Sequence, residues 1–172
     1  MVAPARPPMD DATLSFRRPA EDDYPRMVRV VDDWWGGRKM DVLLPRLWLQ
    51  HFTGTSWIAE TPEGELAGFL VGFLSPDQPD VAYCHMLATN PNVRGKGVGR
   101  ALYEHFFEDA RAGGRSIVTA VTWPANRASL AFHRAMGFEI AAGVGSQNLY
   151  GTPALAGHDF GREDKATLVR RL

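Results

Sequence analysis

Apolar positions recur every three or four residues in two segments of the first third of the chain, which predicts helices over Glu21–Trp35 and Asp41–Phe52. Gly36-Gly37 lies between them and is a strong helix stop. Thr13–Arg17 has the pattern of a short strand before the first helix. The spacing rests on Tyr24, Met27, Val28 and Val31 in the first helix and on a buried face of Leu44, Leu47, Trp48 and Phe52 in the second.

Further along, β-branched and apolar runs alternate with helical patterns. Ser56–Glu60 and Glu65–Leu74 form a predicted hairpin around Thr61–Gly64. Gly143–Asp164 is predicted as one long Gly-rich loop, a length more typical of functional or mobile segments. The remaining predicted elements are strands Val81–Thr89, Ser116–Thr122, Phe138–Ala142 and Lys165–Arg171. One further helix is indicated by the spacing of Val98, Leu102 and Phe106, and another is predicted over Arg127–Met136, ended by Gly137.

The strand Val81–Thr89 has two different faces, because successive side chains of a strand point to opposite sides. One face carries small or apolar residues, including Cys84, and is predicted to be buried. The other face carries Tyr83, His85 and Leu87. Chemistry is therefore expected on the face that holds the tyrosine and the histidine.

Where this strand gives way to the next helix, the chain reads Arg94-Gly-Lys-Gly-Val-Gly-Arg100. Backbone N–H groups at a helix start carry partial positive charge and bind phosphate oxygens, and the three cations add formal charge. The spacing fits neither a dinucleotide-binding glycine motif nor a Walker A loop. The candidate pyrophosphate ligands are Arg94, Gly95, Lys96, Gly97, Val98, Gly99 and Arg100.

Arg94-x-x-Gly97-x-Gly99 resembles the acyl-CoA signature of the GNAT superfamily of N-acyltransferases. A second segment about 30 residues on, Asn126-x-x-Ser129-x-x-Phe132 followed by Gly137-Phe138, resembles that superfamily's second acyl-CoA motif. His133 stands where the family usually has tyrosine. A strand-to-helix glycine turn also has a purely steric explanation, but two motifs in order make that explanation weaker.

Composition agrees with a globular enzyme. The chain has 172 residues, is 45% hydrophobic and carries a formal net charge of −1, which argues against a nucleic-acid binder. The longest apolar run, Leu66–Leu74, is too short to span a bilayer, so no membrane partner is expected. One cysteine and no signal-peptide pattern favour the cytoplasm. Residues 1–12 are expected to be a disordered tail and 13–172 one domain.

The resemblance implies a single α/β domain with a mixed, twisted sheet, splayed at the central strand and flanked by helices on both faces. It implies acetyl-CoA as co-substrate and no metal. The pantetheine arm would pair with Leu87, Ala88 and Thr89, and the Leu87 N–H would stabilise the oxyanion. The second motif would add Asn126, Ser129, Phe132 and His133 as cofactor contacts, although Asn126 also suits a helix N-cap.

Direct attack on a thioester needs an amine that has lost its proton, and the leaving thiolate needs stabilisation. His85 is the candidate base or water relay, with packing or substrate orientation as the alternative. Tyr83 lies one step away, about where some family members carry a glutamate base. His133 is the proton donor to the thiolate, a neutral ring against the cofactor, or a surface residue.

The acceptor side is expected at the loop that follows the first helix. Trp34 and Trp35 point about 100° apart on a helix, so one is predicted to be core and the other to line the acceptor slot, with packing of both as the alternative. Asp32 or Asp33 could hold an ammonium and Arg38 a carboxylate, with ordinary solvated surface charge as the alternative for each. Trp123 and Tyr150 would complete an aromatic wall.

These features predict N-acetylation of a primary amine on a small molecule or peptide, by direct attack in a ternary complex. Two alternatives stay open: acetylation of protein lysines or N-termini, and a non-catalytic acyl-CoA sensor. A homodimer is also left open.

Overall fold

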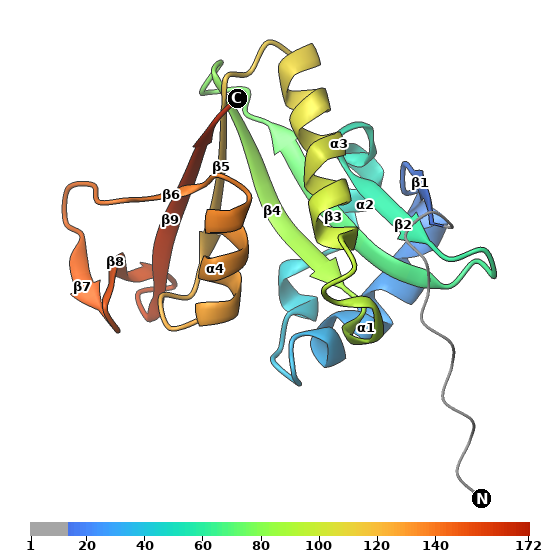
Figure 1. Ribbon diagram of the computed structural model, residues 1–172, viewed down its shortest axis with the longest axis horizontal. Coiled ribbons are helices and arrows are strands. Elements are labelled where there is room, and N and C mark those ends of the chain that lie inside the picture. Colours follow the sequence, from blue (N-terminus) through green and yellow to red (C-terminus); the bar gives the residue numbers. More distant parts are fainter. Residues whose placement is uncertain (1–13) are drawn as a thin grey trace, which may run out of the picture. The chain divides into compact units, whose positions relative to one another are not determined.

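The computed structural model describes residues 14–172, so the expected tail and Thr13 lie outside the described residues (Figure 1). The chain falls into two compact units, one formed by the segment up to Val71 together with Met86–Phe106, the other by Gly72–His85 together with Phe107–Leu172. Three elements run through both units: strand β3 (Leu66–Leu74), strand β4 (Val81–Thr89) and helix α3 (Val98–Ala112).

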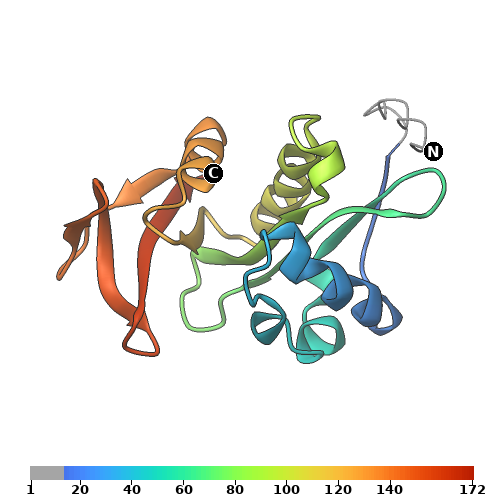
Figure 2. The same cartoon turned by 90° about the horizontal axis from the view of Figure 1, so that it is seen from below.

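In the first unit the strand order is β1-β2-β3-β4, with β1 (Ser15–Arg17) and β2 (Trp57–Glu60) paired antiparallel. Helices α1 (Tyr24–Trp34) and α2 (Leu47–His51) lie on one side of these strands and α3 on the other, as Figure 2 shows. The core on the α1 side is built from Met27, Val31, Trp34, Leu44, Leu49, Ile58, Leu66, Phe69, Val71, Met86 and Ala88. Because β3 is covered on both faces, its side chains are buried almost without alternation.

Helix α3 packs on β3 at a glycine. A Cβ added at Gly68 would lie 2.9 Å from the carbonyl oxygen of Ala88 and 3.1 Å from side-chain carbons of Val98 and Leu102. The close approach of helix and strand therefore depends on the absence of a side chain at residue 68.

The predicted helix over 41–52 is wrong in its middle. The structure has a 3-10 turn η3 (Asp41–Leu43) and a five-residue α2 that starts only at Leu47. Pro45 lies between them; it cannot donate a helical hydrogen bond, and it disfavours helical geometry at the residue before it. Leu44 and Leu49 are buried, whereas Leu47, expected in the core, is exposed.

In the second unit, β4 pairs parallel with β5 (Ile117–Thr122), and the order continues β5-β9-β8-β7. Within the described residues the parallel pairing covers Val81–Tyr83 and Ile117–Thr119, whereas β4 itself continues to Thr89. The remaining elements are α4 (Arg127–Ala135), β6 (Glu139–Ala141), β7 (Gln147–Leu149), β8 (Thr152–Asp159), β9 (Glu163–Arg171) and the 3-10 turns η2 (Glu21–Asp23), η4 (Thr53–Thr55) and η5 (Pro91–Val93).

The expected loop over Gly143–Asp164 is wrong, because it contains β7 and β8. The two strands are joined by Tyr150-Gly151, and both residues have positive φ, at 54° and 76°. Two consecutive positive φ values are the geometry of the tight hairpin turn that matches strand twist. The asparagine-glycine pair that usually signals this turn is missing, and Pro153, Ala154 and Gly157 weaken the strand pattern of β8.

A cluster of ion pairs fixes the start of α1. Arg17 donates to both oxygens of Asp23 at 2.7 and 2.8 Å and to both oxygens of Glu60 at 2.9 Å, and Arg26 contacts the same two carboxylates. Burial raises the pKa of Asp23, but hydrogen bonds from Arg17 and the Ala20 N–H outweigh it and hold the pKa at about 2. Hydrogen bonds from Arg17 also lower the pKa of Glu60.

Acid should therefore weaken this cluster. The depressed pKa of Asp23 means that its carboxylate stabilises the fold above its ordinary value of 3.8, and that this contribution is lost as pH falls through about 2. We expect Asp23→Asn to lower the free energy of unfolding at pH 7 by on the order of 2 kcal/mol, and the gap to wild type to narrow at pH 3. Urea denaturation at both pH values measures this, with the exposed neighbour Asp22→Asn as matched control. A gap that is the same at both pH values would contradict the assignment.

Candidate active site

In the first unit, the segment after β4 forms a compact turn that leads into α3. The Asn90 side chain accepts a hydrogen bond from the Asn92 N–H at 3.0 Å, and the Lys96 N–H donates to the Val93 carbonyl at 3.3 Å. Gly95 and Gly97 have φ values of 78° and 85°, a region that side chains disfavour. The two glycines thus allow the turn after which the first N–H groups of α3 lack intrahelical partners.

The cations of this segment differ in their surroundings. Arg100 is exposed and lies 3.8 Å from Glu104, one turn further along α3. Arg94 is exposed, yet its guanidinium donates to the backbone carbonyl of Trp34 at the end of α1. The predicted pyrophosphate loop therefore carries positive charge together with the start of a fifteen-residue helix.

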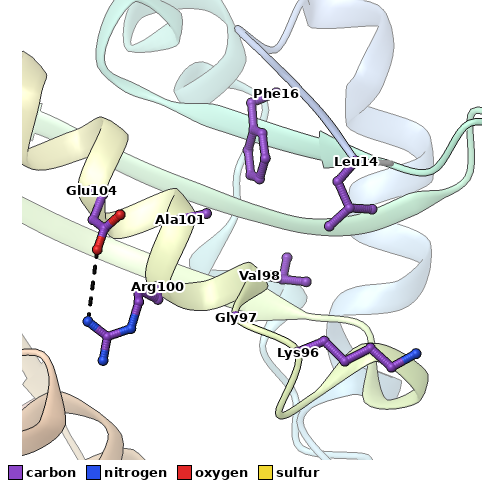
Figure 3. Close-up of a pocket in the computed structure, with 8 residues that line it drawn as sticks. All are labelled: Leu14, Phe16, Lys96, Gly97, Val98, Arg100, Ala101 and Glu104. Atoms are coloured by element: carbon purple, nitrogen blue, oxygen red, sulfur yellow. Dashed lines mark ion pairs between the residues drawn. The ribbon is translucent and has the colours of Figure 1, made fainter. Parts of the chain in front are cut away.

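A hollow of about 160 Å³ lies beside the start of α3 (Figure 3). Leu14 and Phe16 approach it from the region of β1, whereas Val98 and Ala101 come from α3. Lys96, Gly97, Arg100 and Glu104 complete its lining.

In the second unit, the first half of β4 has the predicted two-faced character. Ala82 and Cys84 are buried, and Tyr83 and His85 are half-buried on the other face with ring centroids 6.4 Å apart. Burial, and then the nearby charges of Cys84 and Asp159, raise the pKa of Tyr83 to about 12. Tyr83 is therefore a neutral phenol at neutral pH, which can donate a hydrogen bond but is a poor base.

The second motif builds the start of α4. The Asn126 side chain accepts from the Ser129 N–H at 3.1 Å, which is the N-cap geometry. The Ser129 hydroxyl lies 3.0 Å from that of the buried Thr122 on β5. The expected N-cap of Asn126 is confirmed, and its contact with the cofactor stays a prediction.

His133 is buried, with 8% of its surface exposed, between the rings of Phe132 and Phe138. Its Nδ1 lies 2.8 Å from the Ser129 carbonyl oxygen, so the neutral ring donates its Nδ1–H there. Burial lowers the pKa of His133, and the bond to Ser129 only partly opposes this. The surroundings thus favour the neutral ring over the charged proton donor, and both roles stay predictions.

Among the acceptor candidates of the first unit, the two tryptophans differ in burial, although both contact the same hydrophobic core cluster. Trp34 is 8% exposed and stacks on Phe69 with ring centroids 6.0 Å apart, whereas Trp35 is half-buried. The side chains of Asp33 and Arg38 are exposed. Trp34 is therefore a core residue, and a role of the half-buried Trp35 toward the acceptor stays a prediction beside its packing against the core.

The Asp32 side chain stabilises the segment that follows α1 by hydrogen bonds. Its Oδ1 accepts from the Met40 and Asp41 N–H groups at 2.8 Å each, and its Oδ2 accepts from Lys39 at 3.2 Å. These backbone hydrogen bonds lower the pKa of Asp32. The carboxylate thus closes the segment 33–39, and Asp33 is the better placed of the two for binding an ammonium ion.

Trp123 and Tyr150 contact each other in the second unit, and their role as a wall of the acceptor slot stays a prediction. Their ring centroids lie 5.9 Å apart at 65°, with 39% and 57% of their surfaces exposed. The Arg127 guanidinium contacts the Tyr150 carbonyl and donates to Thr152 at 3.4 Å. Arg127 therefore fixes the turn that presents Tyr150, a role that sequence reasoning missed because no local pattern links a helix start to a hairpin turn.

Over residues 14–172, no helix has the length and apolar character needed to cross a membrane. In the same part of the chain, His, Cys, Asp and Glu side chains form no group of three that could hold a metal ion.

Comparison with known proteins matches residues 15–138 to the acetyltransferase (GNAT) family. The L-2,4-diaminobutyric acid acetyltransferase of Nocardia farcinica is 32% identical over 141 residues, which cover 80% of this chain and 71% of that protein. Its counterpart in Bordetella parapertussis is 29% identical over 114 residues, covering 66% and 61% of the two chains.

Two solved structures share the fold. Diaminobutyrate acetyltransferase EctA from Paenibacillus lautus, in complex with L-2,4-diaminobutyric acid and coenzyme A, has a TM-score of 0.67 at 23% identity over 91% of this chain and 93% of that one. Ard1 from Thermoplasma volcanium has a TM-score of 0.74 at 19% identity, covering 93% and 98%. The expected α/β fold and the expected class, acetyl-CoA-dependent N-acetyl transfer, are thus confirmed at the level of the family. The chain belongs to the acetyltransferase (GNAT) family.

Proposed function

We propose that this chain transfers the acetyl group of acetyl-CoA to one primary amine of a small diamino acid of the class of L-2,4-diaminobutyrate. The observation that carries the proposal is the 32% identity, over 80% of the chain, to a relative named for that acceptor. A small acceptor also suits the exposed, opposite charges of Asp33 and Arg38, because a diamino acid carries both ammonium and carboxylate groups.

In the proposed reaction the acceptor nitrogen attacks the thioester carbonyl carbon and forms the C–N bond. The Leu87 N–H donates to the oxyanion, the C–S bond breaks, and the thiolate of CoA leaves. The amine gives up its proton to His85, directly or through water. The pyrophosphate would bind at Arg94–Arg100, and Asn126, Ser129, Phe132 and His133 would contact the cofactor, with the His133 ring neutral. The cytoplasmic location, a homodimer, and the absence of nucleic-acid and membrane partners stay predictions.

A panel of amines tests the acceptor class. Thiol release from acetyl-CoA is followed with L-2,4-diaminobutyrate, L-ornithine, L-lysine and a peptide with a free N-terminus, and products are identified by mass spectrometry. We expect the highest kcat/KM for L-2,4-diaminobutyrate, with a margin of about tenfold over L-lysine, because one or two additional methylenes alter the fit by 1–3 kcal/mol. L-2-Aminobutyrate and 4-aminobutyrate each lack one amine and identify the one that reacts. A preference for the peptide would favour N-terminal acetylation, and CoA binding without amine-dependent thiol release would favour a sensor.

The pH dependence of the rate separates the two histidines. If His85 accepts the proton, kcat/KM should rise with pH along an acidic limb that His85→Ala removes. His133→Tyr, which restores the residue usual in the family, should retain most of kcat and leave the limb unchanged, because a neutral His133 transfers no proton. An unchanged limb in His85→Ala would assign proton removal to water and amine desolvation.

A further inference from the structure

Helix α1 ends in an arrangement that gives each of its last carbonyls a partner. The Val31 carbonyl accepts from the Trp35 N–H at 3.3 Å. The next two carbonyls accept from the two glycines that follow, Asp33 from Gly36 at 3.0 Å and Asp32 from Gly37 at 2.9 Å. The two hydrogen bonds donated by the glycines form the Schellman motif, which requires the positive φ of 69° that Gly36 has.

The final carbonyl of α1, that of Trp34, has a partner from outside the helix. It accepts a hydrogen bond from the guanidinium of Arg94, sixty residues further along the chain. A cation at a helix C-terminus also lies at the negative end of the helix dipole. The Arg94 side chain thus completes α1 as a capping group would.

The two residues joined by this bond lie beside the proposed cofactor site and the proposed acceptor site, respectively. Arg94 opens the glycine segment that leads into α3, where the cofactor pyrophosphate is proposed to bind. Trp34 lies directly before the segment that holds Trp35 and Arg38, the proposed acceptor side. That segment is closed at its far end by Asp32, which holds the N–H groups of Met40 and Asp41. The hydrogen bond from Arg94 therefore links the start of residues 35–39, the acceptor segment, to Arg94–Arg100, the cofactor segment.

We propose that Arg94 is a positioning residue that bridges the CoA pyrophosphate and the Trp34 carbonyl, so that cofactor binding fixes the acceptor segment. A guanidinium has five N–H groups in a rigid fork, and the bond to Trp34 uses one of them. The remaining donors can reach an anion while that bond persists. The pyrophosphate then fixes the Arg94 guanidinium by an ion pair, and the guanidinium fixes the end of α1 by its hydrogen bond to the Trp34 carbonyl. The inference rests on the proposed function in one respect, that CoA is the ligand of this segment.

Limited trypsin digestion of the full chain tests the tie, meaning the effect of the Arg94–Trp34 hydrogen bond on residues 35–39. Arg38 and Lys39 are exposed cleavage sites within these residues. The rate of cleavage after these two residues is followed by mass spectrometry. Cleavage of a folded segment tracks its open population, so loss of a charged hydrogen bond should speed it about tenfold in Arg94→Gln without ligand. Arg111→Gln is the matched control, because it removes an exposed cation from the last turn of α3, outside the proposed cofactor contacts, and its rate should equal that of wild type.

The bridge is tested by repeating the digestion with CoA at saturation, as established by calorimetry for each variant. CoA should slow cleavage of wild type and Arg111→Gln at least fivefold and leave Arg94→Gln unprotected. Arg94→Lys, which keeps the charge without the fork, should lie between them.

Equal cleavage of wild type and Arg94→Gln without CoA would overturn the tie, and equal protection of both by CoA would overturn the bridge. No acceptor is used, so a wrong acceptor class leaves the result intact. If calorimetry detects no CoA binding to wild type, the proposed function fails, and the unliganded comparison still decides the tie.

Discussion

Replacing Gly97 by glutamate is expected to abolish acetyl-CoA binding, with at least a 100-fold loss of affinity by calorimetry. Gly97 lies immediately before the first residue of α3, and its carbonyl accepts the Ala101 N–H at 2.9 Å. A glutamate there brings negative charge and bulk to the place proposed for the pyrophosphate. The protein should stay folded, because a side chain at a φ of 85° costs about 1–2 kcal/mol.

Gly97→Ala is the matched control, since it imposes the same backbone strain without the charge. We expect Gly97→Ala to lose stability to a similar degree and to keep most of its affinity. A folded Gly97→Glu protein that binds acetyl-CoA as wild type does would show that the pyrophosphate lies elsewhere.

Truncation of Trp34 to alanine should cost about 3–5 kcal/mol of unfolding free energy, the range seen for large core aromatics. The indole is 8% exposed, stacks on Phe69, and belongs to the cluster that joins α1 to β3 and β4. Trp35→Ala, one residue away, should lose less than about 1.5 kcal/mol and instead raise the KM for the amine with little change for acetyl-CoA.

Urea denaturation of the two variants, together with steady-state kinetics, measures both effects. Equal stability losses would mean that both tryptophans are core residues, and an unchanged amine KM in Trp35→Ala would remove it from the acceptor side.

Elements with a strong period were predictable from the sequence. The bounds of β4 are as predicted, and α3 covers the predicted helical spacing of Val98, Leu102 and Phe106, because strict alternation and regular helical spacing extend over nine and fifteen residues. The helix over 41–52 failed because its apolar spacing continues across Pro45, and spacing alone carries no information on a missing donor. The β7–β8 hairpin was missed because Tyr150 occupies a left-handed conformation that asparagine or glycine normally marks.

The candidate residues divide in a similar way. Glycines at fixed spacing identify the Arg94–Gly99 segment, since backbone geometry demands them there. Contacts between distant segments left no such signal, as with the Arg94 bond to Trp34 and the Arg127 bond to Tyr150. The burial of His133 could not be predicted either, because it depends on a ring contact with Phe138, in the turn between α4 and β6.

Because residue 68 carries only a hydrogen atom as its side chain, helix α3 and the cofactor segment before it can lie close to the strands. Even a methyl group at residue 68 would press on the Ala88 carbonyl and on Val98 and Leu102 of α3. The helix would yield first, because the strand is held by its neighbours on both sides, and its N-terminal end would be displaced from the end of β4. Residue 68 is not itself a proposed cofactor contact, yet it lies against Ala88 and Val98, which are, and it therefore limits how closely α3 approaches the β4 backbone. Efforts to reshape acceptor choice in this enzyme can vary Trp35 and Arg38, but they should keep the positive-φ glycines 36 and 37 and leave residue 68 as glycine.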